Sequence, residues 1–497
     1  MTPMMERNTL LDNLSALNYR RTADALAMWQ GDAAAVNPNR LYEEYAPFLR
    51  LKTLNRIDRE FKGISRQKVR HAFIDHYLQH ALLPHETEMQ TWMRGAAAVV
   101  NGQRIGFGNI IHWCQKACTH ADRENLQKET GPLCKFFKPF ALNYWEILLD
   151  ILKNELGFDT YLAYCGDKKG IDYDFFCHEL QRLLDETGPL YFNAMQAWVQ
   201  NSFDLPLERL NRFDAIHLFG MRAFNGLFPG DALDHARTFL RKWRIDLDAL
   251  EGLHLHTEKN DRKSDQAMSF LLRIPGDVHL VINPVGGWID LETIWHELGH
   301  GLSAALTSPE LPFIDRELAT SYSLSESFAF LIQNIGLSLP FLRQFLDIPR
   351  EEAHRLYYYK TLKDLALFRR YAAKLIAEHR MFHTGELADG EPYATTMQRH
   401  TGFYHQPESH LFDLVPEFYC LDYLLGWMGE AAMEAHLREH FGEAWMFSPG
   451  AGSRLKQWWL QGNRLDIFAF FEFNALGPLH ADLLIKRWER VLGDRSK

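Results

Sequence analysis

The chain is poor in cysteine, with six among 497 residues. Small secreted domains that depend on disulfides carry a far denser set, so this chain is not built on a disulfide framework. Cys114, Cys118, His120 and Cys134 lie close together in the sequence and raise the alternative of a zinc cluster. Their four-residue spacing and apolar neighbours favour ordinary helix core instead.

Long apolar runs and basic runs are also missing. No uninterrupted apolar stretch approaches the about 18 residues of a membrane span. Charged residues interrupt residues 1–30 from Glu6 to Asp24, a pattern that favours an amphipathic helix over a signal peptide. We therefore expect a cytoplasmic protein with no membrane partner. The net charge of −10 and the lack of a Lys/Arg-rich run argue against nucleic acid as a main partner.

The composition is that of an ordinary globular protein, with 46% hydrophobic and 24% charged residues. Amphipathic helical runs such as Tyr144–Leu156 and Asp172–Thr187 are separated by Gly and Pro. Residues 253–256 and 277–283 have the pattern of short strands, and His254 and His256 are expected on one strand face as ordinary partners. The sequence predicts a mainly α fold with a small β-sheet, divided near residue 250 into segments 1–250 and 251–497.

The most informative motif is His296-Glu297-Leu298-Gly299-His300, an H-E-x-x-H pentad. Histidines four residues apart on a helix lie on one face, so both imidazoles can bind one ion. Glu297 lies beside that ion, where a base for an attacking water is needed. If 291–306 is a helix, the apolar residues form a stripe opposite the histidines: Leu291, Trp295, Leu298, Leu302 and Ala305. A solvated polar face is the alternative for the histidine side.

A third ligand is suggested by Glu326. After Pro309 and Pro312, a second helix is predicted to begin near Arg316 and Glu317. This helix is apolar or small almost all round, so it is expected to be buried. A buried carboxylate costs several kcal/mol unless it is paired or metal-bound. Pairing with an arginine such as Arg316 is the alternative; His296, His300 and Glu326 together would bind zinc and leave one position open for water.

At this point the chain resembles the thimet oligopeptidase and oligoendopeptidase F group of gluzincin metallopeptidases, family M3. The resemblance covers roughly residues 250–490 and depends on the order of short motifs. These are His279–Pro284 as an edge strand, Thr293–His300, Ser325–Ser327, Phe368–Arg370, Gly390–Pro392, Phe418–Tyr423 and Gly462.

The resemblance implies a zinc-dependent endopeptidase or oligopeptidase with one Zn²⁺ per chain. It implies a two-lobed, zincin-like helical fold with the site on the floor of a deep channel, so that peptides are the partners. Segment 1–250 would form one channel wall, and 251–497 the zinc-binding lobe. Tyr419 and Tyr423 occupy the place of the family's catalytic tyrosines, and a tyrosine hydroxyl is a suitable oxyanion donor. The strand that ends at Asn283 is expected to pair with the substrate backbone.

The chain departs from the family pattern at two positions. Members commonly carry a histidine shortly after the pentad and another before the tyrosines, where this chain has Ser303 and Glu417. His405 or His410 is a candidate to replace the second as a substrate-binding group.

Two alternatives remain open. The first is a metallocarboxypeptidase of the carboxypeptidase Taq type, which has similar length and also H-E-x-x-H, although its other signatures are not found around Glu326. The second is a non-catalytic helical zinc-binding protein, against which Glu297 speaks, because a structural zinc site needs no base. The oligomeric state and the preferred peptide sequence do not follow from the sequence.

Overall fold

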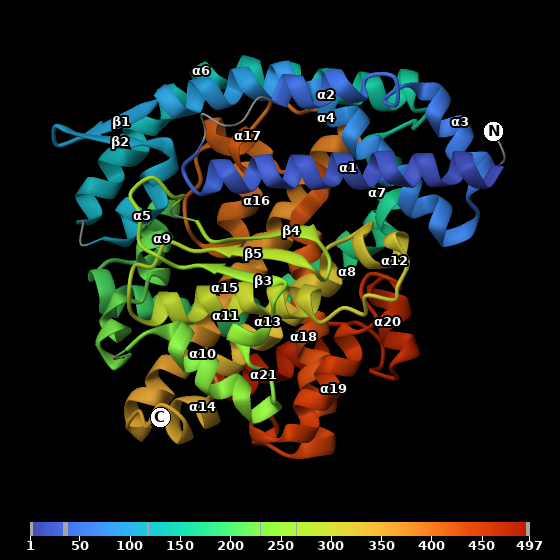
Figure 1. The fold of residues 1–497 in the computed structure, drawn as a ribbon. Coiled ribbons are helices and arrows are strands. Elements are labelled where there is room, and N and C mark those ends of the chain that lie inside the picture. The colour runs from blue at the N-terminus through green and yellow to red at the C-terminus, as the bar shows by residue number, and fades with distance from the viewer. Residues whose placement is uncertain (1–2, 33–37, 117–118, 229, 265, 494–497) are drawn as a thin grey trace. The chain divides into compact units, whose positions relative to one another are not determined.

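The computed structural model describes residues 3–32, 38–116, 119–228, 230–264 and 266–493 (Figure 1). Helix accounts for 72% and strand for 5%, which confirms the predicted mainly α fold. The chain forms two compact units. The first unit comprises Met1–Ala81, Phe224–Ala353 and Leu425–Leu483, and the second unit comprises Leu82–Ala223, His354–Leu424 and Leu484–Lys497. Among the described helices, none has both the length and the apolarity needed to cross a membrane.

The units are interleaved along the chain, which differs from a single boundary near residue 250. Long helices that pass from one unit into the other produce this arrangement. They are α4 (Gly63–Gly95), α15 (Arg350–Thr384) and α18 (Tyr419–Phe441), followed by α21 (Asp482–Leu492). Local sequence cannot reveal such a crossing, because the helical pattern continues unbroken through it.

The first unit contains a three-stranded sheet and a set of helices around it. Its helices are α1 (Pro3–Trp29), α2 (Pro38–Tyr45), α3 (Leu51–Glu60), α10 (Ala232–Leu240), α11 (Trp288–Ala305), α12 (Phe313–Glu317), α13 (Ser323–Gly336), α14 (Leu339–Gln344), α19 (Pro449–Trp459) and α20 (Ile467–Phe473). Its strands are β3 (Leu253–His256), β4 (Met268–Arg273) and β5 (Asp277–Val281).

The strand order is β3-β5-β4, with β3 parallel and β4 antiparallel to β5. The predicted strand 253–256 is present, and the predicted strand 277–283 is present as the shorter β5, which ends at Val281. However, β5 is the central strand and not an edge strand. Its backbone is paired on both sides, so β5 has no free edge for a substrate. The sequence analysis did not predict β4, and therefore did not predict that β4 pairs with β5.

The sheet lies between α1 and α11 (Figure 1). On the α1 side, Phe270 and Leu272 of β4 and Val281 of β5 form a buried cluster with Leu26. Trp29 closes this cluster, packing edge-on against Phe270 with ring centroids 5.9 Å apart. The opposite face of the sheet is apolar too, and α11 covers it, so the pentad helix has a fixed support.

α11 and α13 pack against each other at a glycine within the pentad. A Cβ on Gly299 would collide with the Cα of Ala329 and lie 2.7 Å from the carbonyl oxygen of Phe328. Both of those groups are backbone and cannot move aside like a flexible side chain. The absent side chain therefore lets the two helices approach closely enough to bring their polar residues together.

We expect Gly299→Ala to destabilise the first unit by about 1–3 kcal/mol, because overpacking forces the helices apart. The measurement is the midpoint of denaturant unfolding compared with the wild type. Gly226→Ala is the matched control: it lies in the same unit, and a Cβ there meets nothing within 4 Å. Equal midpoints for both variants would show that the close approach at Gly299 contributes nothing.

The second unit is mainly helical, and its strands among the described residues are β1 (Ala97–Val100) and β2 (Gln103–Gly106), which form a hairpin. Its helices are α5 (Ile110–Gln115), α6 (His120–Asp150), α7 (Tyr161–Lys169), α8 (Tyr173–Phe203), α9 (Arg212–Phe219), α16 (Glu391–Thr401) and α17 (His410–Asp413). The two predicted helices in this region are present but longer than expected, since α6 and α8 continue through internal prolines.

Two helix boundaries near the pentad also differ from the prediction. The pentad helix begins at Trp288 and not near residue 291. The predicted second helix is two elements, because the short α12 ends at Glu317 and α13 starts only at Ser323. Glu326 therefore lies in the first turn of its helix.

Candidate metal centre

The structure brings His296, His300 and Glu326 together. One ligand atom from each lies within 4.8 Å of the others. The two histidines come from α11 and the carboxylate from α13, and Glu326 is buried, with 1% of its surface exposed. This convergence contradicts the alternative of a solvated polar face. Four of the five residues of the expected apolar stripe of α11 are buried and Ala305 is partly exposed, which confirms the predicted orientation of the helix.

The spacing of the ligand atoms suits a small divalent cation. Oε2 of Glu326 lies 3.5 Å from Nε2 of His296 and 3.8 Å from Nε2 of His300. With zinc–ligand bonds of about 2.0–2.1 Å, a tetrahedral site separates its ligand atoms by about 3.4 Å. The three groups thus fit a zinc ion with only small adjustments. Arg316, the alternative partner of Glu326, bonds instead to the carbonyls of Pro309 and Leu311 and to Glu317.

The other nitrogen of each imidazole is held by α13. Nδ1 of His296 lies 2.9 Å from Oε1 of Gln333, and Nδ1 of His300 lies 2.7 Å from Oγ of Ser325. A ring N–H donated at Nδ1 leaves Nε2 with a lone pair that faces the carboxylate, as a metal-binding histidine requires. Gln333 is itself held by Glu292, to whose Oε1 its amide donates at 3.4 Å.

Electrostatics favour neutral histidines at this site. Burial lowers the pKa of His296 to about 4, and the bond to Gln333 opposes that shift. Burial, reinforced by the neighbouring His296, lowers the pKa of His300 well below its ordinary value. Since only a neutral imidazole has a lone pair for a cation, both residues are in the form that binds a metal.

Glu297 does not belong to the ligand cluster and faces the sheet. Its carboxylate Oε2 accepts a hydrogen bond of 2.5 Å from the hydroxyl of Ser269 on β4. Burial raises the pKa of Glu297 to about 7, and the bond from Ser269 opposes this rise. A carboxylate that is buried, oriented and adjacent to two potential metal ligands has the features of a general base.

If Glu297 acts as a base in hydrolysis, we expect Ser269→Ala to lower kcat/KM about tenfold, because a hydrogen bond to a charged group contributes about 1.5 kcal/mol. Zinc content should not change, since the hydroxyl of Ser269 bonds to Glu297, which is not one of the three residues of the ligand cluster. Ser269→Thr retains the hydroxyl and is expected to restore most of the activity. Steady-state kinetics on one peptide, with metal analysis of each variant, makes the comparison. A fully active alanine variant would show that the bond does not position Glu297.

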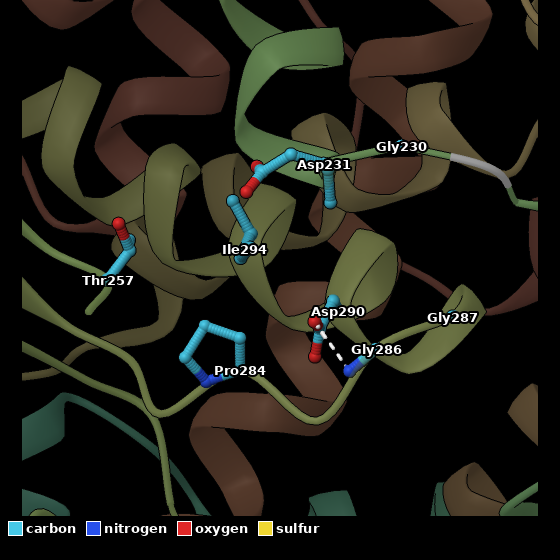
Figure 2. A pocket seen from close by; sticks show the side chains of 9 residues that line it. Gly230, Asp231, Thr257, Pro284, Gly286, Gly287, Asp290 and Ile294 are labelled. Carbon is cyan, nitrogen blue, oxygen red and sulfur yellow. Dashed lines mark hydrogen bonds between the residues drawn. The ribbon is translucent and has the colours of Figure 1, made fainter. Parts of the chain in front are cut away.

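A pocket of about 360 Å³ lies at the N-terminal end of α11 (Figure 2). Gly286 and Gly287 form its rim with positive φ values of 90° and 82°, a conformation that favours glycine. The carboxylate of Asp290 accepts hydrogen bonds from the N–H groups of Val285 and Gly286, at 3.0 and 2.8 Å, which fixes the turn. The lining residues do not include the pentad residues His296, Glu297 and His300, so this pocket is not the metal centre.

The structure gives the candidate substrate-binding residues internal roles. The side-chain amide of Asn283 bonds to both backbone groups of Asn260, at 3.2 and 3.1 Å. β5 is central and ends at Val281, so the predicted edge strand is wrong, while substrate binding by Asn283 itself stays a prediction. His405 and His410 are buried in the second unit. Nitrogens of both rings lie 2.7–2.9 Å from backbone carbonyls, which favours a structural role for each.

Tyr419 and Tyr423 begin α18 and belong to the second unit. Their rings make an edge-to-face contact with centroids 5.1 Å apart, so the two lie on one side of the helix as predicted. At the positions where the family pattern differs, Glu417 pairs with Lys168 at 2.7 Å, and the hydroxyl of Ser303 donates to the carbonyl of His300 at 2.9 Å. Both replacements serve the fold.

The cysteine cluster shows no sign of a metal site among the residues described there. Cys114 belongs to a buried apolar cluster, Cys134 is buried, and His120 bonds to Asp214 at 3.0 Å. Cys118 lies outside the described residues. Ordinary core packing accounts for the other two thiols, as the sequence suggested.

The sequence did not reveal the residues that support the centre. Ser325 and Gln333 flank Glu326 on the same helix, so their spacing of one and seven residues offered a weak signal. Ser269 gave none, because the strand that carries it was not predicted. Searches for relatives provide no further guidance: the chain matches no protein-family model and no curated protein.

Proposed function

We propose that this protein is a zinc-dependent peptidase of the thimet oligopeptidase and oligoendopeptidase F type, which hydrolyses short unstructured peptides. The observation that carries the proposal is the convergence of His296, His300 and Glu326. Glu297, which follows His296 in the sequence, is buried and accepts a hydrogen bond from Ser269. The set of two histidines and one glutamate is that of catalytic zinc sites, in which a fourth position stays open for water.

Different residues of the chain would bind the zinc ion and transfer the proton. His296, His300 and Glu326 would hold the zinc ion. When bound, the ion would lower the pKa of a coordinated water to about 7 and polarise the peptide carbonyl. Glu297 accepts the proton of the attacking water and delivers it to the leaving amine as the C–N bond breaks. Ser269 orients Glu297 for both transfers.

The finer features of the fold belong to the same proposal. They are two lobes that enclose a deep channel, and a zincin-like arrangement around the pentad. Tyr419 or Tyr423 would donate a hydroxyl hydrogen bond to the developing oxyanion, a contribution of about 10²–10³ in turnover in other enzymes. Glu297 also favours a peptidase over a non-catalytic zinc protein. Burying its carboxylate costs free energy, and a catalytic role would explain why a carboxylate occupies this position.

We expect the purified, zinc-loaded protein to cut unstructured peptides of modest length and to leave a folded protein intact, because a channel excludes folded domains. The measurement is mass-spectrometric mapping of products from a peptide mixture, with a stable globular protein as parallel substrate. Cleavage at internal bonds supports an endopeptidase, and stepwise loss of C-terminal residues supports the carboxypeptidase alternative. Efficient cutting of the folded substrate without prior unfolding would refute the channel.

A further inference from the structure

A second group of metal-binding side chains lies on the α1 side of the sheet. The register pairs His254 of β3 with His279 of β5 and His279 with Phe270 of β4, so these three side chains share one face. Asp277 and His256 lie two residues from these histidines on their own strands and therefore point the same way. α1 packs over Phe270, at the β4 side, and the polar group occupies the β3 side of the same face.

The four polar residues form a connected chain. Nε2 of His279 lies 2.7 Å from Oδ1 of Asp277, and its Nδ1 lies 2.8 Å from Nε2 of His256. Nε2 of His254 lies 3.5 Å from the same Asp277 oxygen. The rings of His254 and His279 have centroids 4.5 Å apart. The planes of His256 and His279 differ by only 4°, with centroids 5.1 Å apart, so these two rings meet edge to edge through their nitrogens.

We propose that His254, Asp277 and His279 form a second metal site, which binds a divalent transition ion of the zinc type. One ligand atom of each lies within 4.8 Å of the others. Imidazole and carboxylate are the ligands that zinc accepts, and three protein ligands leave further positions to water. This site would add a second ion, held less tightly, to the single zinc of the pentad.

His256 supplies the support that a metal-binding histidine needs. In one tautomer, Nε2–H of His279 donates to Asp277, and Nδ1 accepts from Nε2–H of His256. In the other, the His279 proton sits on Nδ1 and is donated to Nε2 of His256, whose own proton moves to Nδ1. The second tautomer leaves Nε2 of His279 with a lone pair for the ion, and no net proton is released from the two rings. Outer partners of this kind typically change metal affinity by about 10–100-fold.

The sheet group is better preorganised than the other exposed group of this type. Asp174, His379 and His383 also meet the spacing requirement. Its carboxylate, however, is 79% exposed, whereas Asp277 is 27% exposed and lies on a central strand. Binding an ion at Asp174 would have to immobilise a free side chain, at a cost in conformational entropy. The strands hold the sheet group in place beforehand.

The test is a zinc titration of the full chain by isothermal calorimetry, with each candidate group altered in turn. We expect the wild type to bind a tight and a weaker ion. His279→Asn and His254→Asn should each abolish the weaker binding and leave the tight ion in place. Glu326→Gln should abolish the tight binding and leave the weaker binding in place. The pentad site and the sheet site can therefore be tested independently. His256→Phe keeps an aromatic ring, lacks Nε2, and should weaken the second ion about 10–100-fold.

His480→Asn is the matched control, since His480 is an exposed histidine that pairs with one carboxylate, Asp482, at 3.3 Å. It should leave both binding steps unchanged. His254 is 43% exposed, so its replacement should not disturb folding, and Asp277→Asn provides an independent third variant. An unchanged weaker step in the folded His254 and His279 variants would overturn the proposal. So would loss of that step in His383→Asn alone.

Discussion

Replacing Glu297 with glutamine is expected to lower the turnover of peptide substrates by about 10²–10⁴-fold, the usual contribution of a general base. The amide has nearly the same shape as the carboxylate but cannot accept the proton of the attacking water. The tightly bound zinc should remain, because Glu297 is directed to Ser269 and not into the ligand cluster. Single-turnover kinetics with elemental analysis on the same sample measures both quantities.

Glu310→Gln is the control for this experiment. Glu310 is exposed in the loop after α11, so the same chemical change there should alter neither rate nor metal content. Wild-type turnover in the purified, zinc-loaded Glu297→Gln protein would rule out this mechanism. Loss of zinc in that variant would instead make Glu297 a ligand.

Replacing Glu326 with glutamine is expected to weaken the tight zinc ion by more than about 100-fold, because it removes one of three ligands. Activity should fall with the bound ion. Gln333→Leu removes only the partner of His296 and should weaken the ion by about 10–100-fold, which gives a graded series. Dialysis against buffers of fixed free zinc, followed by metal analysis, measures each affinity.

Ser327→Ala is the matched control, because Ser327 lies next to Glu326 and its hydroxyl donates only within its helix, to the carbonyl of Ser323 at 2.8 Å. Its zinc affinity should equal that of the wild type. Full occupancy of the tight site in Glu326→Gln at limiting zinc would exclude Glu326 from the ligand set.

The ligand cluster could be predicted from the sequence because its geometry is local. His296 and His300 share a helix face by spacing alone, and Glu326 stood out as an acidic residue in an apolar helix. The breadth of apolar positions around Glu326 also predicted burial correctly. The mainly α fold class could also be predicted, because repeated amphipathic segments are a local signal in the sequence.

Features that depend on distant pairing were not predictable. The position of β5 in the sheet depends on β4, whose residues 268–273 give little signal alone, so the sequence placed β5 wrongly at an edge. The interleaved units follow from helices that continue across a unit boundary. The support of Glu297 by Ser269 joins residues 28 positions apart through tertiary packing.

The place of Glu326 in the first turn of α13 bears on how the protein would fold without the proposed zinc ion. A helix N-terminus carries about half a positive charge, which partly compensates a nearby carboxylate. The surrounding core is aromatic, with Phe239, Trp295 and Phe341 in mutual ring contact at 4.8–5.5 Å. A zinc finger folds only around its ion. Here apolar burial stabilises the first unit, so chelation should yield a folded apoprotein that regains its metal.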